Sequence, residues 1–147
     1  MKTMILTWGG ANRGKSQSLK RLALSIPFAS ILKPWRSDAY DSYVIGTVID
    51  RDEKERRVGV VSLGDPGSCH LDWINECSNY NCDVIVAACR SYGATYGNAY
   101  DIAQDNGYEV IEVTTLFHKG GSALPNGVDL KDVFSENLKY LIMECLK

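Results

Sequence analysis

Eight residues near the start of the chain have the types and the spacing of a phosphate-binding loop. Residues 9–16 read Gly-Gly-Ala-Asn-Arg-Gly-Lys-Ser and fit the pattern GxxxxGK[ST] without a mismatch. Glycines allow a loop to turn its backbone N–H groups inward, where they hold phosphate oxygens. In this pattern Lys15 reaches the terminal phosphates of a bound polyphosphate, and the hydroxyl of Ser16 ligates magnesium. The segment therefore predicts an anion site with a metal ligand.

The residues on either side of this loop predict the elements that would hold it in place. Thr3–Trp8 is largely apolar and predicts a buried strand, and apolar residues recur at helical spacing over residues 15–26. A helix that begins at the loop directs the positive end of its dipole at the same anion. The phosphate-binding residues that the pattern predicts are Gly9, Gly10, Ala11, Asn12, Arg13, Gly14, Lys15, Ser16 and Gln17.

With this loop and its flanking elements the chain resembles the P-loop NTPase superfamily, and the resemblance extends over the alternating strands and helices that follow. It implies binding of a nucleoside triphosphate with Mg²⁺, and a second acidic group, the Walker B aspartate, that holds the metal through water. Asp65 ends the run Val-Val-Ser-Leu-Gly-Asp, just past the strand that we expect to lie beside the strand before the loop. We therefore predict Asp65 as the second metal residue. The other interpretation is a turn aspartate that caps the next helix.

The remaining sequence predicts one α/β domain over residues 1–147. Two strands at residues 43–50 and 57–63 are joined by a short polar link. They favour an antiparallel hairpin, because a parallel crossover needs roughly a dozen residues. Residues 27–42 have no regular pattern and are expected to form a surface connection. We expect three layers, α/β/α, around a mostly parallel sheet of about five strands, one of them antiparallel. The further predicted strands are 83–89 and 108–115, and the further helices are 69–78, 98–106 and 130–146.

Composition narrows the classes of partner and the location. Hydrophobic residues make up 45% of the 147 residues and the formal net charge is -2, so a folded domain is expected and nucleic acid is not supported as a partner. No apolar run approaches the length of a membrane span, and we expect no membrane partner. The five cysteines contain no CxxC pair, which favours reduced thiols in a cytoplasmic protein.

Two details resemble GTPases of the Era type. Asn12 occupies a position where their loop often carries asparagine, and a hairpin precedes Asp65-Pro66-Gly67 much as one precedes their DxPG motif. The spacing differs, because their aspartate stands two residues before the proline. No NKxD or TKxD motif follows any predicted strand, so the residues that read guanine are missing. ATP is therefore the expected ligand, and GTP remains the alternative.

A second partial resemblance is to small nucleoside and nucleotide kinases, which add an arginine-rich lid to the same loop. Only Arg13 and Arg90 have positions suited to phosphate, and Arg90 is as well explained as a solvated arginine at a strand end. Three tyrosines follow it, and they would frame a base or second substrate or else form a packed rim; they are Tyr92, Tyr96 and Tyr100.

These residues together predict a magnesium-dependent ATPase of low intrinsic or partner-stimulated activity, with Lys15, Asp65 and Arg90 in the catalytic roles. Pro66 follows Asp65 where many ATPases place a catalytic glutamate, so no residue is assigned to activate water. One alternative is a phosphotransferase of the nucleoside or nucleotide kinase type with its own phosphoryl acceptor. The other is a GTPase-like or non-catalytic switch that recruits a protein partner when nucleotide binds.

Overall fold

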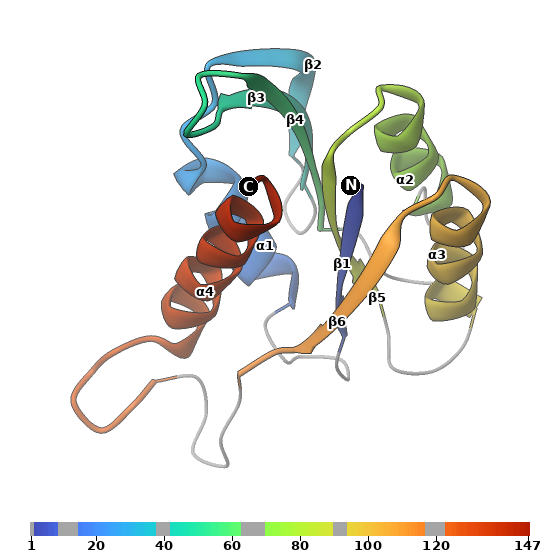
Figure 1. The fold of residues 1–147 in the computed structure, drawn as a ribbon. Coiled ribbons are helices and arrows are strands. Elements are labelled where there is room, and N and C mark those ends of the chain that lie inside the picture. Colours follow the sequence, from blue (N-terminus) through green and yellow to red (C-terminus); the bar gives the residue numbers. More distant parts are fainter. Residues whose placement is uncertain (1, 9–14, 38–41, 63–69, 90–93, 117–122) are drawn as a thin grey trace.

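The computed structural model describes residues 2–8, 15–37, 42–62, 70–89, 94–116 and 123–147. These residues form an α/β fold with a mixed six-stranded sheet and four helices (Figure 1). The order of the strands across the sheet is β2-β3-β4-β5-β1-β6. The strands are β1 (Thr3–Trp8), β2 (Ser30–Ser37), β3 (Ser42–Ile49), β4 (Glu55–Val61), β5 (Val84–Cys89) and β6 (Glu109–Thr114).

The sheet is mostly parallel, as predicted. Strands β4, β5, β1 and β6 are parallel neighbours, whereas β3 is antiparallel to both β4 and β2. Among the described strands, β3 is therefore the one that runs against the rest. The hairpin predicted from residues 43–50 and 57–63 is confirmed, because β3 and β4 pair from Tyr43↔Val61 to Ile49↔Glu55.

The expectation of about five strands is wrong by one, because β2 lies in the segment predicted to be irregular. Its pairing with β3 shifts register between Ile31 and Lys33 and again between Lys33 and Arg36. Pro34 lies within the second shift. A proline and two irregularities remove the alternation that marks a strand in sequence, and an edge strand tolerates both. The strand could be recognised only once its partner β3 was in place.

Two helices cover each face of the sheet (Figure 1). On one face lie α1 (Lys15–Ser25) and α4 (Leu130–Cys145), which pack on one apolar cluster; on the other lie α2 (His70–Asn79) and α3 (Ala94–Asp105), which pack on a second. Helix α3 begins four residues before the predicted start. Gly97 and the nearby tyrosines favoured a loop, but a glycine in a helix costs only about 1 kcal/mol and packing overrides it.

The central strands read as continuous apolar runs because both of their faces are covered. In β1, Ile5 belongs to the cluster under α1 and α4, while Met4 and Leu6 belong to the cluster under α2 and α3. Every residue of β5 is buried, and its side chains alternate between the two clusters. This double burial explains why β1 and β5 were both recognisable from sequence.

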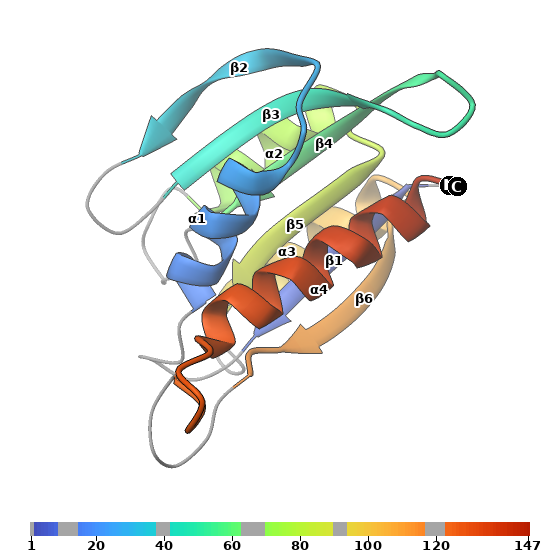
Figure 2. The ribbon, with the colours of Figure 1, turned by 90° about the vertical axis from the view of Figure 1, so that its left-hand side faces the viewer.

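The parallel strands end at one edge of the sheet, which we call the carboxyl edge. Trp8 at the end of β1 is aligned with Cys89 of β5 and with Thr114 of β6, and Val61 of β4 is aligned with Ala87. Figure 2 shows β1, β5 and β6 pointing toward the side where α1 and α4 begin. The segments that follow these strands therefore start from a common edge.

Candidate functional site

The candidate phosphate loop joins the end of β1 to the start of α1. Strand β1 ends at Trp8 and α1 begins at Lys15, so both elements predicted to flank the loop are confirmed. Part of the predicted site lies outside the described residues: Gly9, Gly10, Ala11, Asn12, Arg13, Gly14, Asp65 and Arg90. Lys15 is the first residue of α1, and its side chain lies outside the described part of the structure. The described part of the site consists of Ser16, Gln17 and the elements around them.

Ser16 connects the first turn of α1 to the end of β4. Its Oγ atom donates a hydrogen bond to the backbone oxygen of Ser62 over 3.2 Å. Ser62 is fully buried and directly follows Val61, the last residue of β4. In sequence Asp65 comes three positions after Ser62. The contact therefore brings one predicted metal ligand against the segment that leads to the other.

The expectation that the strand before Asp65 lies beside the strand before the loop is wrong. Strand β5 pairs with β1 on one side and with β4 on the other, and so separates them. All of β5 is apolar and buried, so a central position covers both of its faces. Strands β1 and β4 nevertheless end at the same edge, and the Ser16–Ser62 contact crosses the carboxyl edge between them.

The chain leaves β1 and β5 toward opposite faces of the sheet. Helix α1, which follows β1, packs on one face, and α3, which follows β5, packs on the other (Figure 1). The two strands are adjacent, and Thr7 Oγ1 of β1 donates to the backbone oxygen of Ala87 in β5 over 3.2 Å. Open α/β sheets bind their ligands beyond the carboxyl ends of the strands, at such a divergence of neighbouring connections.

No protein-family model, no curated protein and no solved structure matches this chain. Function is therefore inferred from the residues and from their placement. Two segments with candidate phosphate-binding residues leave the sheet at the same place. The GxxxxGK[ST] residues leave β1 at the point where the connections diverge, and Arg90 follows β5 at the same point.

A set of contacts between α1 and α4 lies beside the start of α1, and Gln17 is the one predicted site residue that takes part in it. Lys131 Nζ of α4 donates to Gln17 Oε1 of α1. One turn further along α1, the guanidinium of Arg21 forms ion pairs with Asp129 at 3.0 Å and with Asp132 at 2.9 Å. We call these five residues the α1–α4 clasp. Of these five residues only Gln17 was named from the sequence, and Asp129 could have been found as an N-cap residue type before the apolar periodicity of α4.

The clasp also shifts the pKa values of two of its residues. Asp129 caps α4 by accepting a hydrogen bond from the backbone N–H of Lys131 over 2.9 Å. That hydrogen bond, followed by the one from Arg21, lowers the pKa of the Asp129 carboxyl below its usual value. In return, the hydrogen bond to Asp129 raises the pKa of Arg21. Both shifts favour the charged form that each group already has at neutral pH.

The predicted donors have the chemistry that magnesium prefers. Mg²⁺ takes oxygen ligands, and it is often held by one or two protein oxygens together with substrate phosphates and water. The Ser16 hydroxyl and the Asp65 carboxyl are donors of this kind. Within the described ranges no three His, Cys, Asp or Glu side chains gather into a metal cluster. Binding through a phosphate ligand does not require such a cluster.

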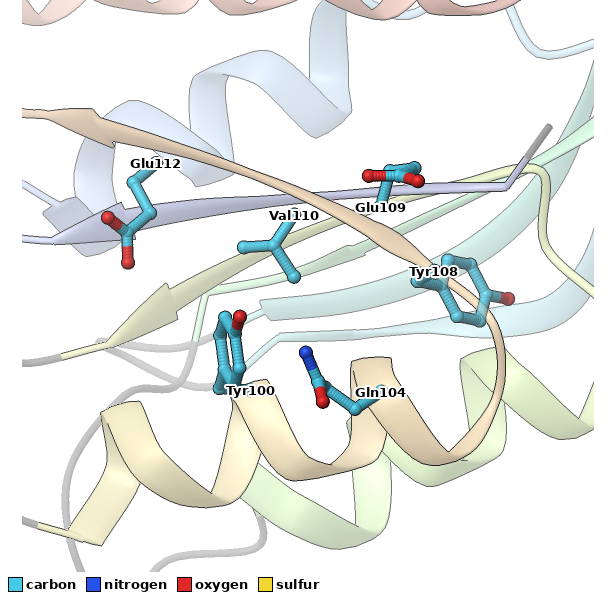
Figure 3. A pocket seen from close by; sticks show the side chains of 6 residues that line it. All are labelled: Tyr100, Gln104, Tyr108, Glu109, Val110 and Glu112. Atoms are coloured by element: carbon cyan, nitrogen blue, oxygen red, sulfur yellow. The ribbon is translucent and has the colours of Figure 1, made fainter.

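A separate hollow of about 580 Å³ lies along β6 on the face that carries α3. Figure 3 shows Tyr100 and Gln104 of α3 directed toward β6, with Val110 and Glu112 across from them. Tyr100 is one of the three tyrosines considered as a frame for a base, and it lies on the face opposite α1.

None of the described helices is long and apolar enough to span a membrane.

Proposed function

We propose that this chain binds a nucleoside triphosphate with Mg²⁺ and hydrolyses its terminal phosphate slowly or with a stimulating partner. One observation carries the proposal: the GxxxxGK[ST] residues occupy the connection from a buried strand, β1, to a helix, α1, at the divergence between β1 and β5. A chance match to the pattern would not require this setting. The same setting agrees with the resemblance to P-loop NTPases.

Each residue of the site has a role in this proposal. Backbone N–H groups of residues 9–15 and the N-terminus of α1 bind the phosphates, and Lys15 stabilises the charge that develops on the transferred group. Ser16 and Asp65 organise Mg²⁺, which neutralises phosphate charge. Arg90 contacts a phosphate from the end of β5. Catalysis of phosphoryl transfer consists mainly of such positioning and electrostatic stabilisation.

Hydrolysis is expected to be slow because no general base is assigned in the site. No residue is assigned to orient or activate water, since Pro66 stands directly after Asp65. Positioned bases typically contribute about 10²–10⁴-fold in rate, so their absence leaves hydrolysis slow. ATP is the proposed substrate, because no guanine-reading motif is present in the sequence.

Thermal-shift titration with Mg-ATP, Mg-GTP and Mg-ADP tests the proposal. A ligand that binds only the folded state at about 100 times its Kd stabilises it by about 2.7 kcal/mol, an easily measured shift. Lys15→Ala should abolish the shift and leave the apo melting temperature unchanged. Lys54→Ala is the matched control, because Lys54 is an exposed lysine in the β3–β4 hairpin, at the far end of β4 from Ser62. An equal shift in the Lys15 variant would refute the assignment.

A product assay distinguishes hydrolysis from the alternatives. Release of inorganic phosphate from ATP in the presence of Mg²⁺ is the expected result, and Lys15→Ala should stop it. Phosphate that appears instead on an added nucleoside or nucleotide would identify a phosphotransferase. Stoichiometric binding without turnover would identify a nucleotide-dependent switch.

A further inference from the structure

We infer that Lys131, contributed by α4, is a second phosphate-binding lysine of the nucleotide site. The inference rests on the proposed function and adds a residue far from the loop in sequence. The Lys131 ammonium donates to the side-chain amide of Gln17, which directly follows Ser16 and is the last of the predicted phosphate-binding residues. Its positive charge therefore lies at the first turn of α1, where the anion is expected.

The clasp determines where Lys131 lies. Arg21 pairs with Asp129 and with Asp132, the residues that flank Lys131 closely in sequence, so the first turn of α4 is bound to α1. Gln17 and Arg21 are four residues apart and lie on one stripe of α1. The two contacts are thus adjacent, and both hold the start of α4 beside the start of α1.

The partner of Lys131 in this contact is uncharged. The two nearby carboxylates form ion pairs with Arg21 at 3.0 Å and 2.9 Å, whereas the described side-chain hydrogen bond of the Lys131 ammonium is with an amide oxygen. The charge of Lys131 also helps to lower the pKa of Asp129, after the hydrogen bonds from the Lys131 backbone and Arg21. The hydrogen bond from Lys131 to Gln17 already has an ionised donor, and a phosphate oxygen would add the attraction of an opposite charge. A phosphate oxygen would therefore compete effectively with the Gln17 amide, and the flexible stem of lysine permits the change of partner.

The charges of the clasp balance only when Lys131 is counted. Arg21 and Lys131 are cationic, Asp129 and Asp132 are anionic, and Gln17 is neutral, so the set carries no net charge. Removal of the Lys131 charge would leave a net negative group beside a bound polyphosphate. That repulsion would add to the loss of the direct contact.

Titration calorimetry with Mg-ATP on the full chain tests this role at two ionic strengths. At about 0.05 M salt, Lys131→Gln should weaken binding roughly fivefold, and at about 0.5 M the difference should shrink, because salt screens the interaction of exposed charges. Lys131→Arg keeps the charge and should bind within about twofold of the wild type. Lys139→Gln is the matched control, a lysine two turns further along α4 that should have no effect.

The outcomes separate this inference from the proposed function. Lys131→Gln with wild-type affinity at both salt concentrations would overturn the role of Lys131 alone, provided that Lys15→Ala still abolishes binding. A loss that is equal at both salt concentrations and is not rescued by arginine would also overturn it, because a structural role does not depend on charge. A wild-type chain that does not bind Mg-ATP would overturn both proposals.

Discussion

The Ser16 hydroxyl donates a hydrogen bond to the backbone oxygen of Ser62 over 3.2 Å, across 46 positions of sequence. The bond uses the single proton of the hydroxyl and leaves the lone pairs of Oγ available. This arrangement suits a metal ligand, because the donated hydrogen bond orients the oxygen while a lone pair coordinates the cation. The contact also joins the start of α1 to the end of β4, so the candidate site is built from both.

Replacement of this hydroxyl should separate its metal role from its structural one. Ser16→Ala should weaken Mg-ATP binding roughly tenfold and have little effect on ATP binding without metal, while loss of the hydrogen bond lowers the free energy of unfolding by about 1 kcal/mol. Ser25→Ala is the control, because Ser25 Oγ in the same helix donates to the backbone oxygen of Leu22 over 2.9 Å. Calorimetry with and without Mg²⁺ measures the difference.

The companion variant is Asp65→Asn, which should chiefly reduce the dependence of ATP binding on magnesium. Asp72→Asn is its control, because Asp72 is an exposed residue in the first turn of α2. If Ser16→Ala reduces binding equally with and without Mg²⁺, the hydroxyl acts only in the fold. If Asp65→Asn changes nothing, Asp65 is a turn residue.

The α1–α4 clasp should make the free energy of unfolding depend on pH in the acid range. The backbone N–H of Lys131 and the Arg21 guanidinium hold the pKa of the Asp129 carboxyl below its ordinary value of 3.8. Since the folded-state pKa is the lower one, the stabilisation is present above the unfolded-state value and disappears as pH falls through the folded-state value. Urea unfolding between about pH 7 and pH 2 should show a decline in the wild type that Asp129→Asn reduces. Parallel curves for the two proteins would contradict this account.

Gly59 of β4 lies at a position that should not tolerate even the methyl side chain of alanine. A Cβ atom there would lie 2.5 Å from Cys77 Sγ and 3.4 Å from Cys82 Sγ, and both cysteines are fully buried. Gly59→Ala should therefore destabilise the fold by about 1–3 kcal/mol through overpacking. Combination with Cys77→Ala should recover part of that loss, which a double-mutant cycle measured by urea unfolding would detect.

Gly97 is the matched control for this prediction. A Cβ at Gly97 in α3 meets nothing within 4 Å, so Gly97→Ala should leave stability unchanged or raise it by up to about 1 kcal/mol. Equal effects of the two glycine substitutions would show that crowding by the thiols is not the cause. Both measurements use the same unfolding experiment.

Local patterns predicted most elements of this fold to within a few residues. Strand β1 and the start of α1 have their expected bounds, and the hairpin of β3 and β4 was recognisable from the short polar link between two apolar runs. These features depend on neighbours in sequence. Strand β2 was missed because a proline and shifts of register hide its alternation, and only the edge of β3 gives it partners.

Periodicity and glycine spacing are local properties of the chain, and they predicted the position of GxxxxGK[ST] between a strand and a helix and every described element except β2. Three relationships could not be predicted from local patterns: β5 separates β1 from β4, Ser16 contacts Ser62, and Lys131 contacts Gln17 across 114 positions of sequence. These relationships arise when apolar surfaces are buried together, and many strand orders satisfy the same local pattern. The order adopted covers both faces of β5, and β1, β4 and β5 end at one edge of the sheet, where the segments with the candidate site residues begin.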